Sequence, residues 1–292
     1  MSKKIGFIGT GVMGAPMVQH LLQAGYQVNV TNRTKSKTDV LVEQGAVWKE
    51  SPADVAKDSD IILTIVGYPS DVEQVYFGEL GILANAKKGT IVVDMTTSTP
   101  TLAKEIYEKA KELGIDAMDA PVSGGDAGAQ AGTLTVMVGG EEEVFEKMTP
   151  VFDAFSKECV LHGEAGSGQY TKMANQIMVA GTMTGFTEMI VYAKAAGLDL
   201  KKVIQTVNGG AAKNWSLEKY GPRILENDYA PGFYVKHFVK DLKIALDEAK
   251  KLNLDLPSTK KAYDLYKELE TLGYDEEGTQ ALVKLWWDRT QG

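Results

Sequence analysis

Residues 5–14 read Ile-Gly-Phe-Ile-Gly-Thr-Gly-Val-Met-Gly, a short apolar run that leads into a glycine-rich turn. The apolar run is suited to a buried strand, and Gly9 lets the chain turn sharply where that strand ends. Gly11 has no Cβ to hold a pyrophosphate away from the backbone, and Gly14 lets the next helix approach the strand closely. The segment therefore has the spacing of a dinucleotide-binding turn.

The sequence on both sides of this turn supplies the context that the motif requires. Apolar residues recur at helical spacing, Gly25 ends that helix, and residues 28–31 predict a second strand. A tight turn without a ligand is the alternative interpretation, and the order strand, turn, helix, strand favours a bound dinucleotide. Free N–H groups at the helix start would face its phosphates. The expected contacts of the turn are Gly9, Gly11, Val12, Met13 and Gly14.

The residues after the second strand indicate which dinucleotide is bound. An acid at this point accepts hydrogen bonds from the ribose 2′-OH of NAD, whereas an arginine accommodates the 2′-phosphate of NADP. This chain has Asn32, Arg33 and Thr34 there, with Lys35 and Lys37 adding positive charge. Ordinary loop residues at the start of the next helix are the alternative. We expect NADP(H) to be preferred over NAD(H).

Length and charge limit the other classes of protein. The chain has 292 residues, of which 44% are hydrophobic and 24% charged, so a globular protein with two domains is expected. Its 31 basic and 39 acidic residues give a net charge of −8. An acidic surface does not attract nucleic acid or an anionic membrane, so neither is expected as a partner.

Targeting and metal signals are missing from the sequence. No apolar run approaches the roughly 20 residues that cross a bilayer, and residues 1–4 lead into the first strand without a signal peptide. The single Cys159 cannot form an internal disulfide. The three histidines are widely spaced and show no ligand pattern. We expect a cytoplasmic protein without a metal site.

The first part of the chain alternates strand and helix signals. Ser51-Pro52 and Pro100 are typical helix starts. Alternation predicts a mainly parallel sheet covered by helices, an α/β fold of the Rossmann type, in an NADP-binding domain over residues 1–165. The expected strands are 5–8, 28–31, 61–66, 91–94, 116–119, 133–138 and 159–161.

After Gly168 the strand signal disappears. A helix over about 168–196 has apolar residues on most faces and would be roughly 40 Å long, enough to join two domains. Residues 166–292 are expected to form an all-α substrate and oligomerisation domain. Its long helix and Trp286-Trp287 predict a homodimer or homotetramer. The later helices are expected at about 199–208, 215–226, 235–252, 257–272 and 276–289.

Two segments near the domain boundary carry polar groups suited to a small acid. Ser123-Gly124-Gly125 follows the strand ending at Asp119, and its hydroxyl and adjacent N–H groups suit a carboxylate, although for the segment taken alone a simple turn is the default interpretation. Lys172 begins the long helix, with Asn175 and Gln176 three and four residues later on the same face. A lysine at a helix N terminus gains nothing from the helix dipole, so a surface role has no support there.

A third segment, Phe233 through Asp241, reads alone as an amphipathic helix with a solvated charged face. Together with the glycine turn, however, the three segments resemble the β-hydroxyacid dehydrogenase family over essentially the whole chain. That family includes 3-hydroxyisobutyrate dehydrogenase, tartronate semialdehyde reductase and glyoxylate/succinic semialdehyde reductase.

The resemblance implies a role for each matching residue. Lys172 corresponds to the catalytic general acid and base that exchanges a proton with the substrate during hydride transfer. The cofactor contacts, beyond those of the glycine turn, are Asn32, Arg33, Thr34, Val66, Thr97 near the nicotinamide, and Lys240. The substrate contacts are Ser123, Gly124, Gly125, Asn175, Gln176, Phe233 and Asp241.

The family pattern is not matched everywhere. Many relatives have asparagine four residues after the lysine, where this chain has Gln176 preceded by Asn175, so either amide can contact the substrate. Val66-Gly67-Tyr68-Pro69 departs from the Leu-Pro common at that point. Two alternatives are an imine reductase, which usually has another residue at the Lys172 position, and a non-catalytic dinucleotide-binding protein. Lys172 argues against both, and an NADPH-dependent reductase of a semialdehyde or glyoxylate is favoured.

Overall fold

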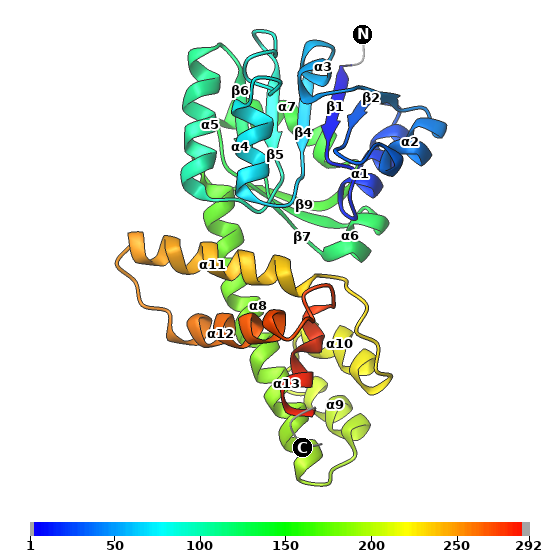
Figure 1. The fold of residues 1–292 in the computed structure, drawn as a ribbon, viewed down its shortest axis with the longest axis vertical. Helices are drawn as coiled ribbons and strands as arrows, with labels where there is room; N and C mark the ends of the chain where they lie inside the picture. Colours follow the sequence, from blue (N-terminus) through cyan, green and yellow to red (C-terminus); the bar gives the residue numbers. More distant parts are fainter. Residues whose placement is uncertain (1–2, 288–292) are drawn as a thin grey trace. The chain divides into compact units, whose positions relative to one another are not determined.

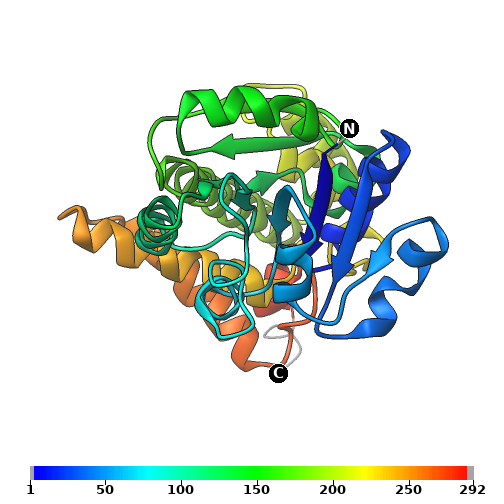
Figure 2. The same ribbon diagram turned by 90° about the horizontal axis from the view of Figure 1, so that it is seen from above.

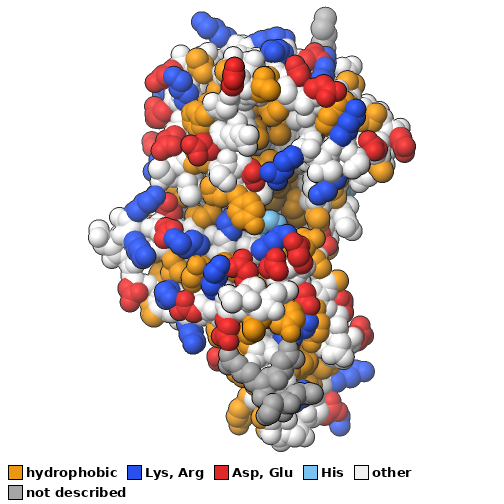
Figure 3. Space-filling model, viewed as in Figure 1, with side chains coloured by type: hydrophobic (Ala, Val, Ile, Leu, Met, Phe, Trp, Pro, Cys, Tyr) orange, Lys and Arg blue, Asp and Glu red, His pale blue; other side chains and the backbone are white. Residues whose placement is uncertain are grey.

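The computed structural model describes residues 3–287 and divides into two compact units, Met1–Lys172 and Met173–Gly292. The first unit contains the strands and the second is helical, as Figure 1 shows for each part. Among residues 3–287, no helix has the length and apolar character that a membrane span needs. On the face drawn in Figure 3, acidic and basic side chains are interspersed over the surface.

A six-stranded parallel sheet forms the centre of the first unit. Its strands lie in the order β3-β2-β1-β4-β5-β6. The order reverses between β1 and β4, which is the point where ligands bind beyond the carboxyl ends of the strands of such sheets. The strands are β1 (Lys4–Ile8), β2 (Gln27–Thr31), β3 (Val47–Trp48), β4 (Ile61–Thr64), β5 (Ile91–Asp94) and β6 (Asp116–Asp119).

Both faces of this sheet are buried, which explains why its strands read as continuous apolar runs. In β4, Ile61 and Leu63 belong to the core under α1, whereas Ile62 belongs to the core under α3, α4 and α5. Figures 1 and 2 show these helices on the two faces of the sheet. Their bounds are α1 (Gly14–Gln23), α2 (Asp39–Glu43), α3 (Pro52–Lys57), α4 (Pro69–Phe77), α5 (Pro100–Glu112) and α7 (Glu142–Phe152).

The helix starts predicted at Ser51-Pro52 and Pro100 are confirmed. The Ser51 side chain accepts a hydrogen bond from the backbone N–H of Asp54, and the Thr99 side chain accepts one from Leu102. In both cases a proline occupies the first helical position, where the backbone has no N–H to satisfy. The helices α3 and α5 therefore begin where the sequence predicts them.

A second, three-stranded sheet lies in the same unit and was not predicted. It is formed by β7 (Val122–Ser123), β8 (Leu134–Val138) and β9 (Ser156–Leu161). The strands predicted at 133–138 and 159–161 thus belong to this sheet and not to the main one. Strand β7, which pairs antiparallel with β8, is too short to show a hydrophobic period, and the Gly- and Ala-rich α6 (Gly125–Ala131) shows none either.

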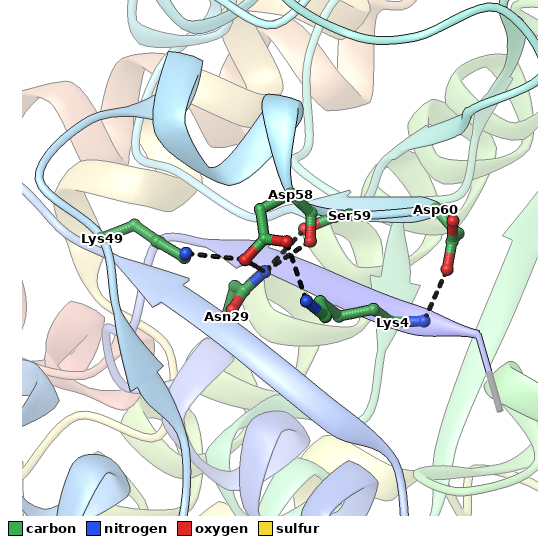
Figure 4. Close-up of polar contacts among 6 residues, drawn as sticks. All are labelled: Lys4, Asn29, Lys49, Asp58, Ser59 and Asp60. Carbon is green, nitrogen blue, oxygen red and sulfur yellow. Dashed lines mark hydrogen bonds and ion pairs between the residues drawn. The ribbon is translucent and has the colours of Figure 1, made fainter. Parts of the chain in front are cut away.

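A cluster of polar and charged side chains links β1, β2 and the residue after β3 to the loop before β4 (Figure 4). The Asp58 carboxylate accepts hydrogen bonds from Lys4 and Lys49, each at 2.7 Å. These two hydrogen bonds lower the pKa of Asp58 to about 2, and the bond from Lys4 has the larger effect. Asn29 on β2 donates to the Asp58 carbonyl at 2.8 Å. The cluster therefore ties β1 and β2 to the loop before β4.

The second unit is built on the long helix α8 (Ser167–Ala195), which begins in the first unit. One face of α8, with Met183, Phe186 and Ile190, is buried against the later helices. On its other face Met178 and Tyr192 are 68% and 74% exposed. The later helices are α9 (Leu200–Asn208), α10 (Trp215–Leu225), α11 (Val235–Lys251) and α12 (Pro257–Thr271).

The helix predicted over 276–289 is wrong as a single element. The described part consists of a 3₁₀ turn η2 (Thr279–Val283) and a one-turn helix α13 (Lys284–Trp287), and residues 288 and 289 lie outside the described residues. Gly278 bonds back to Tyr229 and Thr279 bonds back to Phe233 through their backbone N–H groups. These bonds hold the start of the segment against a distant loop, which a reading of local periodicity does not detect.

We predict that two Gly→Ala substitutions on α8 have opposite effects on stability. A Cβ at Gly168 would overlap the Met137 carbonyl oxygen and lie 2.9 Å from the Asp119 Oδ2, whereas a Cβ at Gly181 meets no atom within 4 Å. Gly168→Ala should lower the free energy of unfolding by about 1–3 kcal/mol. Gly181→Ala should raise it by up to about 1 kcal/mol, because alanine is the better helix former. Urea unfolding measures both, and equal effects would contradict the tight packing at Gly168.

Candidate active site

The glycine turn after β1 has the geometry of a phosphate cradle. Gly9 has a φ of +99°, and a Cβ there would overlap the Ile65 carbonyl oxygen. A Cβ on Gly14 would overlap the carbonyl oxygen of Gly9, so α1 can approach β1 only with glycine at this position. A Cβ on Gly11 would meet no atom within 4 Å, which leaves open space above the turn where a pyrophosphate can approach.

The segment after β2 is tied to this turn. The Asn32 Oδ1 accepts a hydrogen bond from the Thr10 backbone N–H at 3.1 Å, and its Nδ2 donates to the Thr34 carbonyl at 2.9 Å. The Arg33 side chain is 87% exposed and lies with its Nη1 3.4 Å from Asp71. Asn32 thus sets the backbone of the loop, while the guanidinium of Arg33 extends from it into solvent.

Two buried hydroxyl groups at the carboxyl ends of the strands fit a bound dinucleotide. Within residues 3–287, the Oγ1 of Thr10 and the Oγ of Ser98 are buried without a hydrogen-bond partner. Thr10 belongs to the glycine turn, and Ser98 belongs to the loop after β5. Val66, after β4, donates its N–H to the Thr96 hydroxyl of that loop at 2.9 Å. Polar groups for a ligand therefore lie on the turn and on the loop after β5.

A buried carboxylate shapes the loop after β5. Asp94 Oδ1 accepts hydrogen bonds from the Thr64 hydroxyl at 2.9 Å and from the Thr96 N–H at 3.1 Å. The Thr64 hydroxyl also lies 3.1 Å from the Tyr76 hydroxyl. Burial raises the pKa of Asp94, while its hydrogen bonds lower it, and the net pKa is about 6. This network orients the segment that contains Thr97.

A second buried carboxylate marks the start of α8. Asp119, at the end of β6, accepts the backbone N–H groups of Gly166 and Gln169, each at 2.7 Å. Burial raises the pKa of Asp119, while these backbone hydrogen bonds lower it, and the net pKa is about 6. Unpaired N–H groups at a helix start favour a negative charge, so Asp119 fixes where α8 begins.

Lys172 lies one turn after this capped start. It is only 7% exposed, and its Nζ donates a hydrogen bond to the Val122 carbonyl at 2.8 Å. Val122 directly precedes Ser123, and Gly124 and Gly125 have φ values of +130° and +65°. The ammonium group and the Ser-Gly-Gly segment therefore lie together within the first unit.

The second unit collects the remaining predicted polar residues. Asn175 Nδ2 donates to the Gln176 Oε1 at 2.7 Å, and Gln176 Nε2 donates to Asp241 Oδ2 at 2.7 Å. The Lys240 ammonium lies 3.1 Å from the other oxygen of Asp241. Phe233 instead packs against Phe238, with ring centroids 5.4 Å apart. Four of the five residues thus form one chain of polar contacts, and Phe233 packs against the hydrophobic core of the second unit.

Three residues of this arrangement were not among the predicted site residues: Asp94, Asp119 and Gln169. The two acids could have been found as charged residues at the ends of apolar strands, where carboxyl ends of a parallel sheet collect functional groups. Gln169 lies inside the quoted Gly166–Gln176 segment without any local signal. Its side-chain partners are in the loop after β5, more than 70 residues away in sequence.

Comparison with known proteins matches both halves of the chain to family models. Residues 4–163 match the NAD binding domain of 6-phosphogluconate dehydrogenase. Residues 166–286 match the model described as the NAD-binding domain of NADP-dependent 3-hydroxyisobutyrate dehydrogenase. Together these matches extend over almost all of the described residues.

Curated relatives align over almost the whole of this chain. A probable 3-hydroxyisobutyrate dehydrogenase-like protein 1 of Arabidopsis thaliana is 48% identical, covering 96% of this chain and 84% of the relative. The 2-hydroxy-3-oxopropionate reductase of Escherichia coli is 41% identical, covering 96% of each chain. An NAD-dependent L-serine dehydrogenase of Pseudomonas aeruginosa is 38% identical, covering 99% of each.

A solved structure of the same architecture is the 3-hydroxyisobutyrate dehydrogenase of Mycobacterium tuberculosis with L-serine. It is 28% identical with a TM-score of 0.89, covering 98% of this chain and 99% of that one. The fold predicted from the sequence, a Rossmann-type sheet followed by a helical part, is therefore confirmed. The relatives include enzymes named for different small acids, and one of them is named as NAD-dependent.

We predict that Asp94→Asn gains stability relative to the parent as the pH rises. Burial raises the pKa of Asp94 from 3.8 to about 6, so its contribution to stability is fully present below pH 3.8 and is lost as the pH rises through 6. A neutral amide does not carry this cost. The stability difference in favour of the variant should grow by roughly 3 kcal/mol at most between pH 4 and 7.

Urea unfolding at several pH values measures this difference. Asp119 titrates in both proteins, and because its charge also raises the pKa of Asp94, the measured difference includes the coupling between the two acids. Asp264→Asn, which removes an exposed carboxylate of α12 that pairs with Lys260, is the control, and the difference for Asp94→Asn should grow more than the difference for this variant. A difference for Asp94→Asn that stays constant from pH 4 to 7 would contradict the burial cost.

Proposed function

Because this chain belongs to the β-hydroxyacid dehydrogenase family, we propose that it transfers a hydride between NADP(H) and a small semialdehyde or β-hydroxyacid, with Lys172 as general acid and base. The family supports an NAD(P)-dependent hydroxyacid dehydrogenase. The observation that carries the finer proposal is the buried Lys172 ammonium, bonded to the Val122 carbonyl beside Ser123.

Lys172 can exchange a proton at the substrate oxygen. In the reducing direction its ammonium donates a proton to the carbonyl oxygen, and in the oxidising direction its neutral amine accepts the hydroxyl proton. A bound NADPH would supply the hydride. The hydrogen bond from Nζ to the Val122 carbonyl holds the amine at 2.8 Å from a neutral acceptor. That bond helps to fix the direction of the amine.

The Ser-Gly-Gly segment suits the substrate carboxylate. Positive φ values at Gly124 and Gly125 turn the backbone there, and successive N–H groups in such a turn form a concavity for anions. The hydroxyl of Ser123 adds a donor. Asn175 and Gln176 lie one turn beyond Lys172 on the same helix, where their amides can orient the substrate.

The Asp241 contact gives the amide pair its support. Gln176 bonds to Asp241, which in turn pairs with Lys240. From the family resemblance, we propose that Lys240 contacts the cofactor and that Phe233 shapes the substrate pocket. On the cofactor side, the proposed contacts are the glycine turn, Arg33 at the 2′-phosphate, Val66, and Thr97 at the nicotinamide.

Two other readings have less support. An imine reductase usually has another residue at the Lys172 position, and a non-catalytic dinucleotide-binding protein has no need of a buried lysine beside Ser123.

We further propose that the protein is a cytoplasmic homodimer or homotetramer. The exposed apolar side chains of Met178 and Tyr192 on α8 support association with another subunit.

Replacing Lys172 should remove turnover while sparing the cofactor site. For Lys172→Met and Lys172→Ala we expect kcat to fall by roughly 10²–10⁴-fold, the usual contribution of a positioned acid or base. Titration of NADPH fluorescence should give a Kd close to that of the parent. Lys201→Met, at an exposed position of α9, is the matched control. Near-normal turnover by either Lys172 variant would rule out the assignment.

The substrate and cofactor are tested together by a panel of assays. NADPH and NADH are compared against glyoxylate, succinic semialdehyde, tartronate semialdehyde and methylmalonate semialdehyde, with L-serine in the oxidising direction. We expect one of the semialdehydes or glyoxylate to be reduced with NADPH preferred. No turnover of any of these compounds would overturn the proposed function.

Arg33→Ala should weaken NADPH selectively. Loss of a charge-assisted hydrogen bond costs about 1.5–3 kcal/mol, which is roughly 10–100-fold in the Kd for NADPH, and the Kd for NADH should stay nearly unchanged. Lys57→Ala, another exposed cation of the first unit, is the control. Equal weakening for the two cofactors, or comparable use of both by the parent, would contradict the role of Arg33.

A further inference from the structure

Gln169 is a fully buried amide in the first turn of α8, with 0% of its surface exposed. Its side chain makes two hydrogen bonds to one loop. Oε1 accepts the backbone N–H of Ser98 at 3.0 Å, and Nε2 donates to the carbonyl of Thr96 at 2.8 Å. All of these atoms belong to the first unit.

The two partners of this amide flank Thr97. The Thr96 carbonyl and the Ser98 N–H belong to the peptide groups on either side of that residue. Holding both groups restricts the backbone of Thr97 and therefore the direction of its side chain. Only a group that donates and accepts at once can make this pair of bonds, and a primary amide does so without a charge.

The backbone of Gln169 is held as well. Its N–H donates to Asp119 Oδ2 at 2.7 Å, so the residue is attached to the end of β6 and to the loop after β5. Lys172 follows three residues later, on the same side of the helix. A rotation or shift of this first turn would move the Lys172 ammonium away from the Val122 carbonyl, to which it is now bonded.

We propose that Gln169 is a positioning residue that couples Thr97, on the nicotinamide side, to the proton donor Lys172. It does not touch the reacting atoms. Its amide sets the distance and angle between the loop that faces the hydride donor and the helix turn that carries the acid. This inference rests on the proposed function, because it assigns Gln169 a part in the same reaction.

Gln169→Glu tests the need for an uncharged donor at this position. The carboxylate still accepts from Ser98 but cannot donate to the Thr96 carbonyl, whereas the protonated acid can do both. We expect kcat to be roughly 10–100-fold below the parent at pH 8, since a displacement of about 1 Å can cost 10²-fold. The ratio of variant to parent kcat should rise toward one as the pH is lowered to about 5, because burial favours the protonated acid.

Two carboxylates close to this position titrate in the same range, so the ratio of variant to parent kcat is the quantity to measure. Asp119 contacts the Gln169 backbone and Asp94 contacts the Thr96 N–H, and burial raises the pKa of each to about 6. Both acids, and the Lys172 side chain one turn along the helix, are present in both proteins. KM for the substrate should change less than kcat, because the proposed carboxylate and amide contacts stay intact.

A second readout does not depend on turnover. In the cofactor-free protein, amide hydrogen exchange of the segment 95–98 should be faster in Gln169→Glu at pH 8 and in Gln169→Leu than in the parent. Gln280→Leu is the matched control, because Gln280 is equally buried and its amide bonds to the carbonyls of Asp228 and Ala230. That variant should lower the melting temperature without changing kcat or exchange at 95–98.

The outcomes separate the two proposals. Turnover by the parent, combined with a Gln169→Glu variant whose kcat and pH profile match the parent, overturns the positioning role and leaves the proposed function standing. A lower melting temperature with unchanged kcat and unchanged exchange at 95–98 shows a purely structural amide and also overturns it. Absence of turnover by the parent overturns the proposed function, and this inference with it.

Discussion

The arrangement depends most on the bond between the buried carboxylate of Asp119 and the N–H groups of Gly166 and Gln169. Burying a carboxylate is unfavourable, and the raised pKa of Asp119 is the sign of that cost. Donors at the helix start offset it. The Asp119 carboxylate can come this close to the start of α8 because Gly139 and Gly168 have no Cβ. A Cβ at these positions would lie only 2.5 and 2.9 Å from the carboxylate oxygens. Where α8 begins, and so where Lys172 lies, follows from this contact.

Asp94, at the end of the neighbouring strand β5, is likewise a buried carboxylate that accepts hydrogen bonds from the segments around it. Its carboxylate accepts from Thr64 and Thr96 and carries the same upward pKa shift. Both acids end strands of the parallel sheet, and each orients the backbone of the segment that follows. Ionisation of these two buried acids lowers the stability of the protein near neutral pH, while their hydrogen bonds define the local backbone geometry. Gln169 links the two segments, so the acids and the amide form one connected support.

Much of the fold and the glycine turn of the dinucleotide-binding domain could be predicted from local sequence. Gly9, Gly11 and Gly14 act through their own backbone conformations and through the space that a Cβ would fill, so their spacing alone carries the information. The support of the site could not be predicted in this way. Gln169 contacts a loop more than 70 residues away, and no local pattern records such a pair. Strand β7 was missed for a similar reason, because it exists only by pairing with β8.

The sequence by itself determined the class of the fold, the dinucleotide turn and the family, because glycine spacing and apolar periodicity act over a few residues. The candidate lysine also came from sequence, through family resemblance. Only the tertiary structure decided what surrounds it: the Val122 carbonyl at its ammonium, the acid that starts its helix and the amide that joins that helix to the loop after β5. These contacts bring together distant parts of the chain, and burial makes each of them specific because an unpaired polar group there is costly.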